Sequence, residues 1–160
     1  TYEGAPRRAG RANLMRFLLT ERKAAQAAAY LLRAAGGALD YIVLIKLLYL
    51  ADRRALVDRG LPITGDRMVA MPWGPVLSGV LDDINLGKRP LEYRDGGTSW
   101  YEYVTEPEGY TVRALPGRDS TDELSRYELR IISEVFEQFR RIPKWELVKL
   151  THTLPEWRDP

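Results

Sequence analysis

The stretch Asp40–Gly60, DYIVLIKLLYLADRRALVDRG, decides the fold because it has the pattern of a long helix with well-defined ends. Asp40 is a favourable N-cap residue, because its carboxylate can accept hydrogen bonds from the free amides of a first helical turn. Gly60 is a favourable stop, because glycine readily adopts the left-handed backbone that ends many helices. We therefore expect a helix from Tyr41 to Arg59.

This helix is expected to form the core of the protein. At 100° per residue, its broad apolar face consists of Tyr41, Leu44, Ile45, Leu48, Ala55 and Leu56. Leu50 and Val57 add apolar surface on the opposite side, so much of the helix should be buried. Lys46 and Arg53 are expected to point away from the main apolar face.

The sequence around this central helix predicts further helices. Thr20 is a possible N-cap for an alanine-rich segment that is free of glycine and proline. Ser120 and Glu123 have the spacing of a capping box. Pro143 stands at the start of the last helical pattern. The expected helices span 20–35, 121–141 and 144–152.

Shorter segments predict a small amount of β-structure. Residues 67–71 alternate as in a strand, and Pro75 is expected to open a short helix that ends near Gly87. Residues 100–104 and 110–114 are rich in strand-forming residues, with a turn between them, and predict a β-hairpin. The expected fold is α+β and mainly α: a compact helical domain around a buried central helix, with a small antiparallel sheet or hairpin.

Composition places the chain among ordinary globular proteins. Its 160 residues are enough for one domain, and its formal net charge is only +2, so no affinity for nucleic acid follows from charge. The chain has no cysteine, which excludes disulfides and thiolate metal sites. No signal peptide or membrane-spanning run is visible, so we expect a cytoplasmic location.

The first residues carry no apolar periodicity. The segment 1–14, TYEGAPRRAGRANL, is expected to be a disordered or added arm, with Met15 as the original start. The folded domain is expected to span 15–160. A basic cluster near this end is interpreted as solvent-exposed and consists of Arg7, Arg8, Arg11 and Arg16.

The stretch after the central helix, 61–76, LPITGDRMVAMPWGPV, combines strand-like sequence with many turn residues. Thr64 and Asp66 can bond the amides of their own turn, and Gly65 and Gly74 permit unusual backbone angles. Prolines at 62, 72 and 75 stiffen the corners. We expect a rigid strand with fixed ends.

Asp52 is the acidic side chain with the most informative position. It lies on the apolar side of the central helix, near Ile45 and Leu48, where an isolated charge would be costly. It could be a catalytic acid with a shifted pKa or a buried anchor that accepts hydrogen bonds from loop amides. No second catalytic group is placed beside it by spacing, so we favour the anchor.

No catalytic or metal-binding pattern is evident. His152 is the only histidine, and no nucleophile motif accompanies it. Asp82 and Asp83 could contribute a metal ligand, but adjacent helical carboxylates point about 100° apart, so a solvated face is the better interpretation. We expect no enzyme activity, cofactor or metal.

Three blocks of the sequence together resemble the Panacea domain family, the SocA-like antitoxins of toxin–antitoxin systems. These blocks are KLLYLADRRAL, LPITGDRMVAMPWGPVLSGVLDDI and WELVKLTHTLPEWRDP, in that order, and the resemblance covers about 15–160. The residues that carry the signature are Lys46, Leu47, Tyr49, Asp52, Thr64, Gly65, Asp66, Gly74, Pro75, Val76, His152, Pro155, Glu156 and Trp157.

The resemblance implies a bacterial or phage antitoxin that neutralises a co-encoded protein toxin by direct contact. One family member instead delivers its toxin to a protease, so a role as a proteolysis adaptor stays open. The family has no established catalytic residues, and it pairs with unrelated toxins, so the resemblance does not identify the toxin.

Two alternatives are distinguishable from this interpretation. A small metal-dependent or acid–base hydrolase would use Asp52, Asp66 and His152, and would bind divalent ions. A DNA-binding autorepressor would need a basic recognition helix, which the sequence lacks.

A toxin must bind a surface other than the buried face of the central helix. Aromatic residues are preferred anchors in protein interfaces, so the expected hairpin and the turn before it supply the candidates. These are Trp73, Trp100, Tyr101, Tyr103 and Tyr110. For Trp73 a place in the core is favoured, and for Tyr101 and Tyr103 exposure and packing inside the domain are both open.

Overall fold

The structure, a computed structural model, describes the backbone of residues 7–87 and 99–158 and the side chains of residues 21–87 and 99–158. In these residues it contains two two-stranded antiparallel sheets among five α-helices, so the fold is α+β and mainly α, as predicted. The elements in chain order are α1 (Arg7–Ala34), β1 (Ala38–Asp40), α2 (Tyr41–Arg59), β2 (Met68–Met71), β3 (Gly74–Leu77), α3 (Ser78–Gly87), the 3-10 helix η2 (Ser99–Glu102), β4 (Thr111–Arg113), α4 (Arg126–Phe139) and α5 (Lys144–His152).

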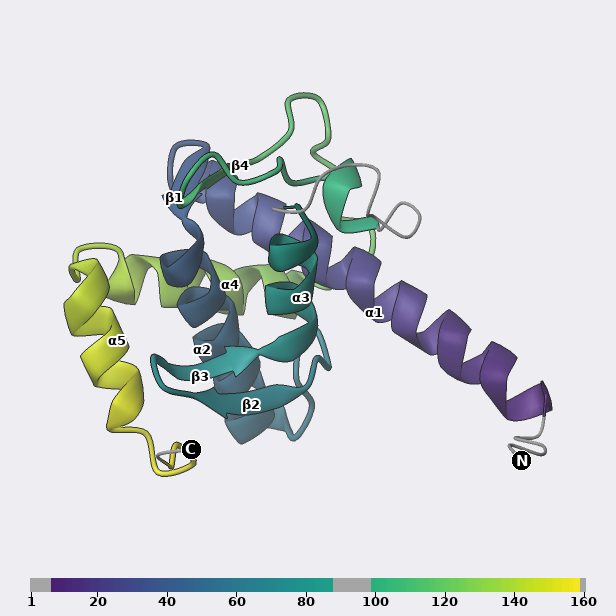
Figure 1. The fold of residues 1–160 in the computed structure, drawn as a ribbon, viewed down its shortest axis with the longest axis horizontal. Helices are drawn as coiled ribbons and strands as arrows, with labels where there is room; N and C mark the ends of the chain where they lie inside the picture. Colours follow the sequence, from purple (N-terminus) through teal and green to yellow (C-terminus); the bar gives the residue numbers. More distant parts are fainter. Residues whose placement is uncertain (1–6, 88–98, 159–160) are drawn as a thin grey trace.

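Helix α2 is the buried centre of the domain, and its expected bounds are confirmed. The Asp40 side chain accepts a hydrogen bond of 2.8 Å from the amide of Ile42, and Gly60 ends the helix with a left-handed φ of 76°. Figure 1 shows α2 in the middle, with α4 passing behind it and α5 and α3 on opposite sides.

Burial along α2 differs from its sequence pattern in two places. Lys46 is buried, because β3 and α5 cover the side of the helix from which it projects. Leu56 and Val57 are exposed, because they lie in the last turn of α2, where the helix is no longer surrounded. Periodicity describes a helix in isolation and cannot say which faces its neighbours cover.

Helix α1 is longer than the sequence predicts. It begins at Arg7, so Thr20 lies inside the helix and is not its N-cap, and residues 7–14 are helical where no regular structure was expected. Residues 1–6 lie outside the described part of the chain. The alanine-rich second half of α1 packs against the core, and Figure 1 shows the first half projecting beyond it. None of the helices in the described ranges is long and apolar enough to cross a membrane.

The stretch after α2 forms a β-hairpin, not a single strand followed by a helix. Strands β2 and β3 are antiparallel, with Met68 opposite Leu77 and Met71 opposite Gly74. Pro75 therefore lies within β3, and α3 begins only at Ser78.

The hairpin expected over 100–114 is largely absent. Its first half forms η2, and its second half, β4, pairs with β1, so that Leu39 lies opposite Val112. What remains of the expected pairing is two isolated antiparallel bridges, Val104 with Ala114 and Glu108 with Thr111. Strand β1 precedes α2 directly, so this pairing ties β4 to the start of the central helix.

Helix α4 starts five residues later than expected, at Arg126 instead of residue 121. Its capping box consists of Ser125 and Glu128, each of which bonds the backbone of the other. The expected box at Ser120 fails because Gln26 of α1 takes its partners: the Gln26 side chain binds Asp122 and the amide of Glu123. The last helix, α5, follows Pro143 as predicted.

Candidate functional site

Gly74 marks the point at which the hairpin, α2 and α5 meet. Its φ of 101° lies in the region that favours glycine. A Cβ at this position would lie 2.7 Å from Oγ1 of Thr151, 2.8 Å from Nζ of Lys46 and 3.1 Å from Cδ2 of His152. The backbone at position 74 therefore approaches its neighbours too closely for any side chain.

Lys46 is a buried base that sequence periodicity missed. Its side chain is 1% exposed, and Nζ donates a hydrogen bond of 2.9 Å to the carbonyl of Pro75 in β3. Burial lowers the pKa of Lys46 to about 8, because the charged form is poorly solvated there. Lys46 thus links α2 to β3, and its effect on the stability of the fold depends on whether its amine is protonated.

We expect the substitution Lys46→Met to change how stability depends on pH. The pKa of Lys46 falls from 10.5 when unfolded to about 8 when folded, so between these values the unfolded chain binds more protons. The free energy of unfolding of the wild type, relative to Lys46→Met, should therefore rise by about 2 kcal/mol from pH 7 to pH 10. Urea unfolding at a series of pH values measures this difference, and a constant difference would contradict it.

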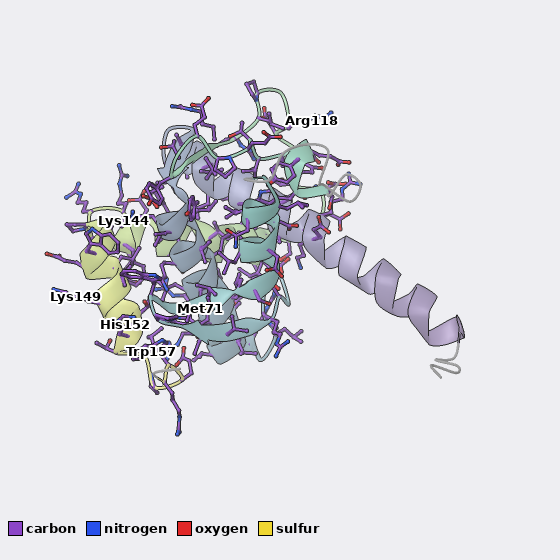
Figure 2. The ribbon with its side chains drawn as sticks, in the orientation of Figure 1. Met71, Arg118, Lys144, Lys149, His152 and Trp157 are labelled. Carbon is purple, nitrogen blue, oxygen red and sulfur yellow. The ribbon has the colours of Figure 1, made fainter. Side chains whose placement is uncertain are left out.

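The end of the chain folds back onto the hairpin (Figure 2). The ring of His152 stacks on that of Trp157, with centroids 4.2 Å apart, and Nε1 of Trp157 donates a hydrogen bond of 3.1 Å to the carbonyl of Met71. Glu156 accepts hydrogen bonds from the Tyr49 hydroxyl at 3.0 Å and from Nε of Arg53 at 2.5 Å. We call His152, Glu156 and Trp157 the C-terminal clasp.

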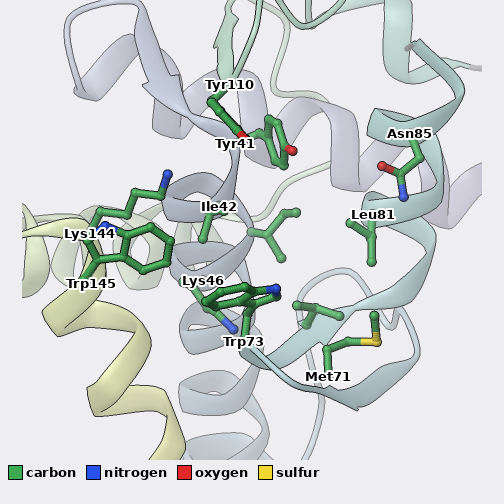
Figure 3. Close-up of a pocket in the computed structure, with 12 residues that line it drawn as sticks. Tyr41, Ile42, Lys46, Met71, Trp73, Leu81, Asn85, Tyr110, Lys144 and Trp145 are labelled. Carbon is green, nitrogen blue, oxygen red and sulfur yellow. The ribbon is translucent and has the colours of Figure 1, made fainter. Parts of the chain in front are cut away.

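A mainly apolar pocket lies beside this junction, between α2, the hairpin, α3 and α5 (Figure 3). Its volume is about 390 Å³, which is within the usual range for ligand or side-chain pockets. We call it the tryptophan pocket. It is lined by Tyr41, Ile42, Ile45, Lys46, Met71, Trp73, Val76, Leu81, Asn85, Tyr110, Lys144 and Trp145.

Two exposed tryptophans stand at the edge of this pocket. Trp73, in the turn of the hairpin, is 60% exposed, and Trp145 of α5 is 53% exposed. Their rings contact each other at a centroid distance of 5.5 Å. The core position favoured for Trp73 is therefore wrong. Trp145 was not among the predicted candidates, because one aromatic residue in a helical pattern gives no sign that the hairpin will bring another beside it.

The other predicted partner-binding residues divide by burial. Trp100 and Tyr103 are buried, so neither is available for direct contact with a partner. Tyr101 is half-buried, and its hydroxyl donates to the carbonyl of Asp83. Tyr110 is 61% exposed and lines the tryptophan pocket. The structure thus brings two of the five candidates, Trp73 and Tyr110, to one exposed site.

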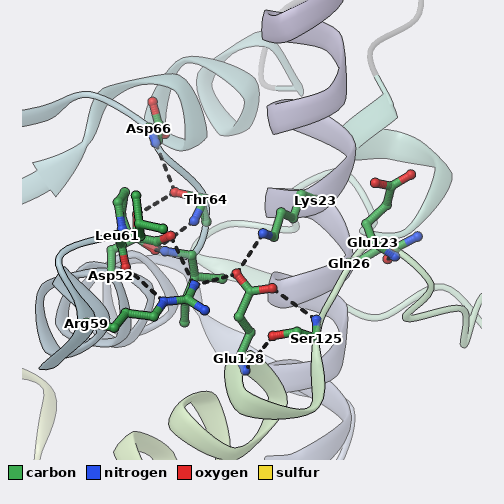
Figure 4. Close-up of polar contacts among 12 residues, drawn as sticks. Lys23, Gln26, Asp52, Arg59, Leu61, Thr64, Asp66, Glu123, Ser125 and Glu128 are labelled. Atoms are coloured by element: carbon green, nitrogen blue, oxygen red, sulfur yellow. Dashed lines mark hydrogen bonds and ion pairs between the residues drawn. The ribbon is translucent and has the colours of Figure 1, made fainter.

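Asp52 accepts hydrogen bonds from the loop that follows α2 (Figure 4). Its carboxylate binds the amide of Ile63 at 3.2 Å, the amide of Thr64 at 2.9 Å and the Thr64 hydroxyl at 2.5 Å. Burial raises the pKa of Asp52 to about 6, although these hydrogen bonds favour the carboxylate. All three donors come from the loop, which is the geometry expected of an anchor.

Asp66 continues this arrangement towards α3. Its amide donates to the Thr64 hydroxyl oxygen, and its carboxylate accepts from the amides of Gly79 and Val80 at 3.0 and 2.9 Å. These amides belong to the first turn of α3, where backbone donors lack partners within the helix. A Cβ on Gly79 would come within 2.7 Å of Asp66 Oδ1, so the contact also requires glycine.

Glu128 links α4 to both α1 and α2 (Figure 4). Its carboxylate pairs with Nζ of Lys23 at 2.6 Å and with the guanidinium of Arg59 at 3.0 Å, besides its bond in the capping box with Ser125. Burial alone would raise the pKa of Glu128, but these partners outweigh it and hold the pKa below its usual value. Glu128 therefore has a structural role, because it holds α1, α2 and α4 together.

The residues of the alternative hydrolase do not form one reactive group. Asp52 and Asp66 are committed to backbone amides, whereas His152 packs in the C-terminal clasp against Trp157. In the described part of the chain, no three histidine or acidic side chains gather in a way that could hold a metal ion. Asp82 is exposed, and burial together with neighbouring acids raises the pKa of Asp83 to about 7.

Comparison with known proteins places the sequence blocks in one family. The family model described as "Antitoxin SocA-like, Panacea domain" matches residues 44–158, from the first turns of α2 to the C-terminal clasp. No curated protein and no solved structure matches the chain. The matched range contains the Asp52 anchor, the hairpin, the clasp and the lining of the tryptophan pocket except Tyr41 and Ile42. Because the match covers most of its length, the chain belongs to the SocA-like antitoxin family, the Panacea domain family.

Proposed function

We propose that this protein neutralises a co-encoded toxin by direct protein–protein contact, and that the contact surface is centred on the tryptophan pocket. The family supplies the antitoxin role. The observation that supports this surface is the pair of exposed tryptophans at the mouth of a mainly apolar pocket. Large apolar side chains are costly to leave in water, and tryptophans are among the commonest energetic centres of protein interfaces.

Elsewhere in the described residues, the large exposed hydrophobic side chains are the aliphatic Leu56, Val57 and Leu61. Most apolar residues of α2 before its last turn are covered by neighbouring elements, and Asp52, Asp66 and Glu128 are occupied in holding loops and helices. By contrast, Trp73 is 60% exposed and its ring contacts that of Trp145, so much of its surface is open to a partner.

The test begins with the product of the adjacent gene, expressed alone and together with this protein. We expect it to arrest growth when alone and to be harmless, and co-purified, when both are present. If the adjacent product is not toxic, or if the wild-type proteins neither co-purify nor rescue growth, the proposed function is wrong.

Trp73→Ala should leave the domain folded and weaken binding of the toxin about 10- to 100-fold, because it removes an interface anchor. The matched control is Leu61→Ala, since Leu61 is 63% exposed and does not line the tryptophan pocket. Circular dichroism checks folding, and calorimetry with the purified toxin measures affinity. Equal affinities for the two variants would remove the tryptophan pocket from the interface.

A further inference from the structure

The tryptophan pocket has a definite chemical character. Its interior is formed by aliphatic side chains of α2, β3 and α3, among them Ile42, Val76 and Leu81, and its rim carries the exposed aromatic rings. Among the described residues, its charged lining residues are Lys46 and Lys144, and no aspartate or glutamate lines it. Such a pocket favours an apolar group with a negative charge beside it.

Lys46 and Lys144 differ in how they could meet a partner. The Lys46 amine donates its hydrogen bond to the Pro75 carbonyl, so only the aliphatic part of its side chain is available to a group in the pocket. Nζ of Lys144 is at the rim, 4.9 Å from the ring centre of Tyr110 and 4.8 Å from that of Trp145 (Figure 3). The positive charge of Lys144 is therefore held directly beside the exposed rings.

Lys144 already has one acidic partner, which fixes its position without using all its donors. Nζ lies 2.7 Å from Oδ2 of Asp40, whose other oxygen caps α2 through the amide of Ile42. Both side chains of the ion pair remain about 25% exposed. An ammonium group has three donors, so a second carboxylate can bind Lys144 while Asp40 stays in place.

The segment that carries Lys144 and Trp145 is also basic. Segment 140–152 has four basic residues and one acidic residue, although the whole chain carries a formal charge of only +2. The basic residues are Arg140, Arg141, Lys144 and Lys149, and the acidic one is Glu146. Opposite charges across an interface speed association and select partners, so segment 140–152 favours a partner with an acidic surface.

We propose that the toxin inserts one apolar side chain into the tryptophan pocket and places a neighbouring carboxylate against Lys144. This inference rests on the proposed function and adds the chemistry by which the partner is recognised. A protein segment satisfies both halves of the site, whereas a nucleic acid has phosphate charge but no aliphatic group to fill a pocket between Ile42, Val76 and Leu81.

Carbodiimide cross-linking tests the carboxylate directly, because it joins an amine to a carboxylate that already contacts it. In the free protein we expect an internal link between Lys144 and Asp40. In the complex, mass spectrometry should find Lys144 linked to an aspartate or glutamate of the toxin, with the internal link at least halved. If the complex forms but Lys144 is never linked to the toxin, the inference is wrong although the proposed function stands.

The matched substitutions are Lys144→Met and Arg118→Met. Arg118 is exposed, does not line the tryptophan pocket and lies far from Lys144 in Figure 2. We expect Lys144→Met to weaken binding about tenfold at 50 mM salt and about threefold at 500 mM, because salt screens the charge contact. Arg118→Met should bind as the wild type does at both salt concentrations.

Three results would overturn the inference while growth rescue persists: equal binding by the two variants, a Lys144→Met effect that salt does not change, or a complex that nuclease treatment dissolves. Thermal unfolding of each variant separates a lost contact from a damaged fold, and salt dependence gives a second readout if Lys144→Met is less stable. Loss of wild-type rescue would instead contradict the proposed function itself.

Discussion

Gly74→Ala is expected to destabilise the domain by about 4 kcal/mol. One part of this loss is backbone strain, because an alanine at a φ of 101° costs about 1–3 kcal/mol. The other is overpacking of about 1–3 kcal/mol, because the new methyl group would lie within 3 Å of Thr151 Oγ1 and Lys46 Nζ. Lys46 could bend away only by giving up its bond to the Pro75 carbonyl while remaining buried.

The matched control for Gly74→Ala is Gly117→Ala. Gly117 has a φ of 76°, but a Cβ there would meet no atom within 4 Å, so only strain applies. Thermal unfolding should show a melting temperature lowered by roughly 8–16 °C for Gly74→Ala, and by only a few degrees for Gly117→Ala. Similar shifts in both variants would mean that the close approach at Gly74 contributes nothing.

Asp52→Ala is expected to lower the free energy of unfolding by about 3 kcal/mol. The substitution leaves the Ile63 amide, the Thr64 amide and the Thr64 hydroxyl without their acceptor in a buried place, and each such loss is costly. Urea unfolding measures the change. Full wild-type stability with complete loss of growth rescue would favour a catalytic role instead of an anchor.

Asp52→Asn is the matched control, because its amide oxygen can still accept from the loop amides. It should cost less than Asp52→Ala, and it removes the titrating group. The folded pKa of Asp52, about 6, lies above its unfolded value of 3.8, so its protonated form is favoured by folding. The wild type should therefore gain stability relative to Asp52→Asn as the pH falls from 7 to 5.

The central helix was predictable because its limits depend on neighbouring residues. The Asp40 cap and the Gly60 stop act within one helical turn, and Lys144 binds the Asp40 oxygen that does not cap the helix. The start of α4 was not predictable in this way, since two capping boxes were available. Gln26, which is nearly a hundred residues away in sequence, binds the partners of the first box, so the second one forms.

Long-range contacts also decide how the strands pair, so local sequence did not predict the pairing. Strand β4 looked like half of a local hairpin, but it pairs with β1, on the far side of α2 and α3 in sequence. Asp52 was correctly identified as a side chain in need of donors, because a carboxylate among apolar residues must be satisfied. The burial of Lys46 and the exposed position of Trp145 beside Trp73 were missed, since both depend on which segments the fold places beside them.

The C-terminal clasp has a consequence for how the protein responds to a protease. Trp157 of the clasp holds the hairpin through the carbonyl of Met71. Glu156 of the same clasp binds Tyr49 and Arg53 of α2, so two neighbouring residues join the hairpin to the central helix. A cut between His152 and Glu156 should therefore loosen the hairpin and α2 together, although every residue of both elements remains.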